Sequence, residues 1–254
     1  MSRAADRSLT PALLVLLGGE VRDLAPALSL AVARRSRRAA RLVASVDASG
    51  RPGDLPRLFR AGVERVTDVR VRAAALRAGY SVRDELLVFP AFALGGEAPS
   101  PDALRDALEA VVRLSTDFYR GTRVNVQALV LLPDLSADRE VRYARAYAQL
   151  AELDRAAGSA APRLDGGPLL SRRWLCDCRT HTGAYAGRVA DVIHPVAEFL
   201  SLMVVESGAP QMDAAFEPAL RAAAAGRSAG YSAPGYAEIG VRRRLVARYM
   251  ACRL

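Results

Sequence analysis

The sequence contains no lysine, only two isoleucines and a single tryptophan, and these absences limit what its charge can mean. All 36 basic residues are arginines, against 27 acidic residues, so the formal net charge is +9. So uniform a bias indicates a GC-rich coding sequence, and no segment combines a basic stripe with interleaved aromatic residues. We therefore expect no nucleic-acid partner. The densest basic cluster, Arg34 to Arg41, is expected to be a solvated helix end, where cations suit the helix dipole.

Long apolar runs and paired cysteines are also scarce. The apolar run near the N-terminus is short for a signal peptide, and no stretch approaches the ~20 apolar residues of a membrane span. Three cysteines fit a reducing compartment, so we expect a soluble, cytoplasmic protein with no membrane partner. Cys176 and Cys178, with His181, form the one conceivable metal cluster. Two cysteines on one strand face need a distant ligand as well, so no metal site is predicted.

Along the chain, short apolar runs alternate with stretches whose apolar residues recur every three or four positions. This alternation predicts an α/β fold with a doubly wound, mostly parallel, Rossmann-like sheet of five or six strands. The predicted strands are 12–17, 40–46, 85–94, 124–132 and 173–178, and the predicted helices are 23–38, 101–119, 138–157 and 187–205.

Two segments depart from this alternation of strand-like and helix-like segments. Residues 47–67 hold three glycines and two prolines, which predicts a loop with at most a short element. After Glu206 come a Ser-Gly-Ala-Pro turn, an alanine-rich helix at about 213–225 and a last segment at 236–254. We therefore predict one domain, residues 1–206, that ends with a long central helix, followed by a short C-terminal appendage, residues 207–254.

One unit of the pattern resembles a known family. The strand VQALVLLPDL (126–135) is followed by REVRYARAYAQLAELD (139–154). This pair resembles the tubulin/FtsZ superfamily and is most similar to the large bacterial tubulin-like proteins, in which the helix reads AYAxLxELD. Three further segments follow in matching order: Trp174–Asp177 as the sixth strand, 188–205 as the central helix and 235–240 as the strand that opens a second domain. The resemblance spans roughly residues 10 to 245 and implies a GTPase-domain-like fold.

In that family, glycine-rich loops after the first and fourth strands hold the phosphates of a guanine nucleotide, so GTP or GDP is the cofactor implied. In this chain each loop is short and continues into a glutamate, Glu20 or Glu97, where the phosphates would lie. Two carboxylates would repel a triphosphate, so we expect a degenerate phosphate site. Alternatively, they share a divalent cation or are solvated acids of a first helical turn. The matching glycines are Gly18, Gly19, Gly95 and Gly96.

The resemblance also implies residues for the rest of the pocket. Asp138 with Arg139 or Arg142 would reach the ribose and base, and His181 would lie at the same edge. For hydrolysis, Asp213 and Glu217 match loosely the acids that one subunit gives to the nucleotide of the next; alternatively they are a helix cap and a first-turn acid. Outside the pocket, His194 precedes Pro195 in the central helix and is expected to be a packing or kink residue.

Three functions remain open. The favoured one is a degenerate tubulin-like domain that acts as a protein-interaction or assembly component, with another tubulin-like protein or itself as partner. It is favoured because the glycine loops are degenerate and only about forty residues follow Ser207, too few for a second domain. The second is a GTP-binding or GTP-hydrolysing protein with an atypical pocket. The third is a Rossmann-like small-molecule enzyme with Asp47 at the end of the second strand, although the first loop lacks G-x-G-x-x-G.

Overall fold

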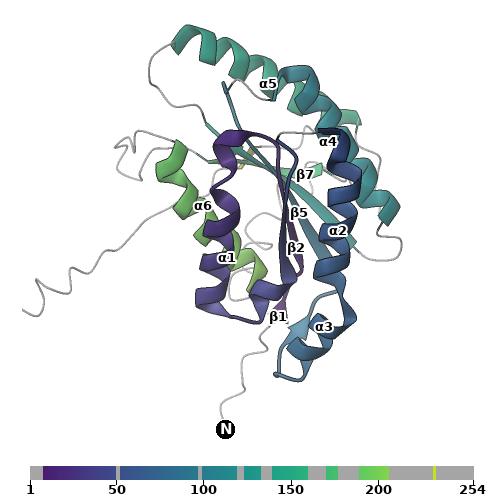
Figure 1. Cartoon of the computed structure of the whole chain (residues 1–254). Coiled ribbons are helices and arrows are strands. Elements are labelled where there is room, and N and C mark those ends of the chain that lie inside the picture. Colours follow the sequence, from purple (N-terminus) through teal and green to yellow (C-terminus); the bar gives the residue numbers. More distant parts are fainter. Residues whose placement is uncertain are drawn as a thin grey trace, which may run out of the picture.

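The computed structural model describes residues 8–49, 52–96, 99–118, 123–132, 139–159, 170–176, 189–205 and 231–232. Its main feature is a six-stranded sheet in which every pairing is parallel (Figure 1). The strands follow the order β3-β2-β5-β6-β7-β8, which confirms the predicted parallel, Rossmann-like α/β sheet in general terms. They are β2 (Ala12–Leu16), β3 (Val43–Asp47), β5 (Glu85–Ala93), β6 (Arg123–Leu131), β7 (Leu170–Cys176) and β8 (Tyr231–Ser232).

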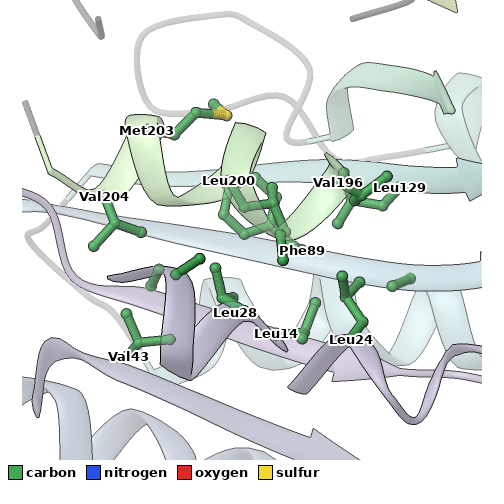
Figure 2. Packing of buried hydrophobic residues seen from close by; sticks show 14 of the residues in the cluster. Leu14, Leu24, Leu28, Val43, Phe89, Leu129, Val196, Leu200, Met203 and Val204 are labelled. Atoms are coloured by element: carbon green, nitrogen blue, oxygen red, sulfur yellow. The ribbon is translucent and has the colours of Figure 1, made fainter. Parts of the chain in front are cut away.

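Helices cover both faces of this sheet, as the doubly wound pattern predicts. Leu14 and Phe89 project from the sheet toward Leu28 and Leu200 on the helices of one face (Figure 2). Alternate strand residues such as Leu13 join the core on the other face. The first face carries α1 (Leu24–Arg35) and α6 (Val189–Val204), and the second carries α2 (Leu55–Thr67), α4 (Pro101–Phe118) and α5 (Arg139–Ser159) (Figure 1). Burial on both sides explains why the central strands β2 and β5 are nearly continuous apolar runs.

Shorter elements complete the described part of the chain. The strands β1 (Ser8–Leu9) and β4 (Ser81–Val82) pair in a small separate parallel sheet. The first expected helix ends at Arg35 rather than Arg38, and β3 begins three residues later than expected, because a 3-10 turn intervenes. The remaining elements are the 3-10 turns η1 (Gly19–Val21), η2 (Ala39–Leu42) and η3 (Pro52–Asp54), and the helix α3 (Val69–Leu76).

The prediction of a loop over residues 47–67 is wrong, because its second half is the 13-residue helix α2. Pro56 lies in the first turn of α2, where a proline costs little since the first N–H groups have no partner within the helix. Gly62 packs on the sheet, and a β-carbon there would lie 2.6 Å from Cδ1 of Leu13. The proline and the glycine that indicated a loop are thus both compatible with this helix.

The basic cluster that begins in the last turn of α1 is only partly a solvated helix end. Arg35 donates a hydrogen bond to Oγ of Ser201 (2.7 Å) and pairs with Glu198 (3.2 Å), both on α6. Arg34 lies 3.7 Å from the same carboxylate. This part of the cluster therefore joins the two helices that cover one face of the sheet.

Most of the predicted appendage lies outside the described residues. Its described residues, Tyr231 and Ser232, form β8 beside β7 at the edge of the sheet. The expected helix at 213–225 and the segments at 235–240 and 236–254 fall outside the described ranges. Within those ranges, no helix has the length and apolar character that a membrane crossing requires.

Candidate functional site

The strand order reverses between β2 and β5. The chain passes from β2 to β3 on one side and then returns to place β5 on the other side of β2. In open parallel sheets, ligands bind outside the carboxyl ends of the strands at such a reversal. The loops that follow β2 and β5 both start there. The N–H of Leu17 donates a hydrogen bond to the carbonyl of Ala91 (2.9 Å), and the N–H of Leu94 donates one to the carbonyl of Leu131 (2.8 Å).

The first loop contains Gly18 and Gly19 and leads directly into helical structure. Gly18 is buried and has an extended backbone, with a φ of −171°. Gly19 is exposed and opens the 3-10 turn η1, which precedes α1. Glu20, the second residue of this turn, is exposed.

The second loop contains Gly95 and Gly96, which are both buried. Gly95 has a φ of +74°, in the left-handed region that favours glycine. Its N–H donates a hydrogen bond to Oε1 of Gln149 on α5 (2.7 Å), and Nε2 of the same side chain donates to the carbonyl of Pro99 (2.8 Å). Gln149 is only 1% exposed, so a buried side chain fixes both ends of this loop.

The two loops meet through Glu20 and Gly96. A β-carbon on Gly96 would lie 3.0 Å from Oε1 and 3.2 Å from Oε2 of Glu20, so the carboxylate lies directly over the glycine. A side chain at this position would make the exposed carboxylate of Glu20 shift by a few tenths of an ångström. An acid of the first loop thus lies against the backbone of the second.

A third group at this edge comes from the end of β3. Asp47 pairs with Arg22 (3.0 Å between Oδ2 and Nε) and accepts hydrogen bonds from the N–H and hydroxyl of Ser49. Arg22 also donates to Oγ of Ser49 at 2.9 and 3.1 Å. Burial works to raise the pKa of Asp47, but the hydrogen bonds from Ser49 and the Arg22 charge outweigh it and lower this pKa below its ordinary value. The carboxylate of Asp47 is therefore ionised and is bound by Arg22 and Ser49.

Of the other predicted pocket residues, the structure describes two arginines at the start of α5. Arg142 lies in α5, and its side chain is partly exposed. Arg139 begins α5, but its side chain is outside the described part. The expectation that His194 packs is wrong, because it is exposed on α6. The predicted residues that lie outside the described ranges are Glu97, Asp138, His181, Asp213 and Glu217.

Glu97, one of the two acids that could share a divalent cation, lies outside the described ranges. Among the residues that the structure does describe, no three His, Cys, Asp or Glu side chains are grouped closely enough to hold a metal ion. Of the conceivable cysteine cluster, the structure describes Cys176, which is buried in β7.

Sequence reasoning missed Gln149, although a signal for it exists. The buried residues of α5 include Ala146 and Leu153, three positions before and four positions after Gln149. A glutamine on the inner face of an amphipathic helix must find hydrogen-bond partners in the core. The ion pair of Arg22 with Asp47 had no such signal, because its residues are 25 positions apart and meet only through the pairing of β2 with β3.

Comparisons of this chain with protein-family models and with curated proteins find no match. The chemistry of the site therefore has to be interpreted from its own residues.

Proposed function

We propose that this chain is a degenerate tubulin-like domain that acts in the cytoplasm as a protein-interaction or assembly component and does not hydrolyse GTP. The resemblance of residues 126–154 to the bacterial tubulin-like proteins supports the family. That resemblance makes β2 and β5 the first and fourth strands. Their direct pairing is compatible with a shared pocket between the two glycine loops.

The observation that carries the loss of GTP binding is the carboxylate of Glu20 over Gly96. A phosphate site needs free backbone N–H groups and no opposing negative charge. A carboxylate about 4 Å from a phosphate charge costs roughly 1 kcal/mol in water and about 4 kcal/mol at the effective dielectric constant near a protein surface. The N–H of Gly95 is also engaged, by Gln149, and does not point to an empty site. Both features oppose a bound triphosphate.

The residues at this edge of the sheet give less support to the two alternative functions, a GTPase and a Rossmann-like enzyme. A GTPase would have to move Glu20 or neutralise it with a cation. A dinucleotide-type enzyme would use an acid at the end of the second strand to bind ribose hydroxyls. Here that acid, Asp47, is engaged by Arg22 and Ser49. The interaction function requires none of these groups to be released.

The test is to remove the charge of Glu20 and measure GTP affinity. In Glu20→Gln the repulsion is lost while the side chain keeps its size, so we expect the affinity for Mg²⁺-GTP to rise about tenfold above the wild type, as a titration with a fluorescent GTP analogue would show. Glu109→Gln is the matched control, because Glu109 is an exposed acid on α4. An unchanged affinity in Glu20→Gln would remove the main support for this function.

A further inference from the structure

The helix α5 has an apolar surface on the side that faces away from the sheet. Its inner side buries Ala146 and Leu153, whereas Tyr147 is 78% exposed and Val141 is 53% exposed. Ala144, between them in the sequence, is exposed as well. A surface helix of a monomer normally carries charged or polar residues on this side. We call the surface the α5 outer face; it consists of Glu140, Val141, Ala144, Tyr147, Ala148, Ala151 and Arg155.

The apolar residues of the α5 outer face have the spacing of a helix-to-helix contact. Val141, Ala144, Ala148 and Ala151 recur at intervals of three, four and three positions. This is the interval pattern that keeps one seam of a helix against a second helix. Exposed tyrosine is also a residue type that contributes strongly at protein interfaces. The occupant that fits such a surface is therefore another helix.

The charges of the α5 outer face identify the occupant. Glu140 lies at its N-terminal end and Arg155 at its C-terminal end, and both are exposed. If two copies of α5 pack antiparallel about a twofold axis between Tyr147 and Ala148, Glu140 of each copy lies opposite Arg155 of the other. A parallel pair would place identical charges together. Arg155 also pairs with Glu152 of its own helix, but a guanidinium carries five donors and can serve a second carboxylate.

The same antiparallel arrangement matches residue sizes. Tyr147 lies opposite the small Ala148 of the other copy, so a large side chain meets a small one near the axis. Ala144 lies opposite Ala151, and two small side chains allow the helices to approach closely there. A twofold contact of this kind needs a self-complementary surface. In this register Glu140 meets Arg155 and Tyr147 meets Ala148, while Val141 meets Asp154, whose charge is balanced by Arg173 of its own chain. We propose that the partner of this chain is a second copy of itself, docked antiparallel through the α5 outer face. The inference rests on the proposed function and specifies its partner.

The contact is expected to be reversible. A helix of 21 residues is about 30 Å long, and one helix pair covers less area than a permanent dimer interface. Sedimentation equilibrium of the full chain over about 5–200 µM should therefore show a monomer in exchange with a dimer, with a micromolar dissociation constant. A chain that stays monomeric over this range would overturn the inference.

Substitution of Tyr147 tests whether this surface makes the dimer. Because Tyr147 is 78% exposed, Tyr147→Asp should leave the unfolding temperature unchanged and weaken dimerisation at least about tenfold. Val69→Asp on α3 is the matched control, because Val69 is exposed to the same extent. A dimer that Tyr147→Asp does not weaken, or that Val69→Asp weakens equally, would contradict the α5 contact.

The charge pairs allow a sharper test of orientation. Glu140→Arg leaves two arginines, and Arg155→Glu two glutamates, at the paired positions, so each variant alone should dimerise about tenfold more weakly. In a mixture, each new charge meets its opposite in the other variant, and a mixed dimer should form with nearly wild-type affinity. A mixture that associates no better than the separate variants would overturn the antiparallel arrangement.

These experiments are done without nucleotide, so their result is separate from the test of the proposed function. A monomeric chain with no affinity for GTP overturns this inference and leaves an interaction role with a different partner. A chain that binds GTP well overturns the proposed function whatever its association state.

Discussion

Gln149 shows how much of the candidate site depends on single side chains. Its amide oxygen accepts the N–H of Gly95, and its amide nitrogen donates to the carbonyl of Pro99. One buried residue of α5 therefore satisfies a donor and an acceptor in the loop after β5. Glu20 acts on the neighbouring glycine, Gly96. Together these two side chains set the chemistry at the meeting point of the loops.

Replacing Gln149 with methionine should destabilise the protein. Methionine fits the volume but leaves the N–H of Gly95 and the carbonyl of Pro99 without their partners. The N–H of Gly95 is buried, and a buried group left unsatisfied costs about 1–3 kcal/mol, so the unfolding temperature should fall by several degrees. The measurement is thermal unfolding followed by circular dichroism, with Arg145→Met, an exposed change on the same helix, as control. Equal unfolding temperatures for Gln149→Met and the wild type would show that these two hydrogen bonds do not stabilise the fold.

At the scale of elements, the packing of α2 against the sheet depends on a glycine. A β-carbon at position 62 would lie 2.6 Å from Leu13 and 3.1 Å from Val46, which are both buried. The close approach places Phe59 and Val63 of α2 in the core on this face of the sheet. This contact explains why a helix-weakening residue occurs inside α2.

Gly62→Ala should destabilise the protein even though alanine favours helices. The gain in helix propensity is about 1 kcal/mol, and overpacking of a filled core costs about 1–3 kcal/mol, so the net loss in unfolding free energy should be about 1 kcal/mol. Urea unfolding measures it. Gly53→Ala is the control, because a β-carbon there meets no atom within 4 Å. If Gly62→Ala is as stable as Gly53→Ala, α2 does not pack as closely as described.

The elements show which features the sequence could predict. The apolar runs that became β2, β5 and β6 were predictable within about one residue, because strands buried on both faces must be apolar throughout. The helix α2 was not, because Pro56 and Gly62 indicate a loop unless the tertiary contact of Gly62 is known. Similarly, the motif around Gln149 was visible, but the partners of its side chain lie on another loop 50 or more residues away.

At the scale of the whole molecule, the site is a product of topology. Glu20 and Gly96 are far apart in the sequence and meet because β2 pairs with β5 rather than with β3 alone. Sequence periodicity predicts strands and helices but carries no information on the order of strands in a sheet. The sequence shows a glutamate after each glycine pair. It does not show that Glu20, which follows the first pair, lies over Gly96 of the second.

The most direct test of the central claim is thermal unfolding of the wild-type chain with and without 1 mM Mg²⁺-GTP. Saturation with a ligand at a hundred times its dissociation constant adds about 2.7 kcal/mol, which corresponds to a rise of roughly 5–10 °C for a chain of this length. We expect a change below about 1 °C with GTP, equal to that with tripolyphosphate at the same ionic strength. A rise of several degrees that grows with GTP concentration would contradict the account of a degenerate phosphate site.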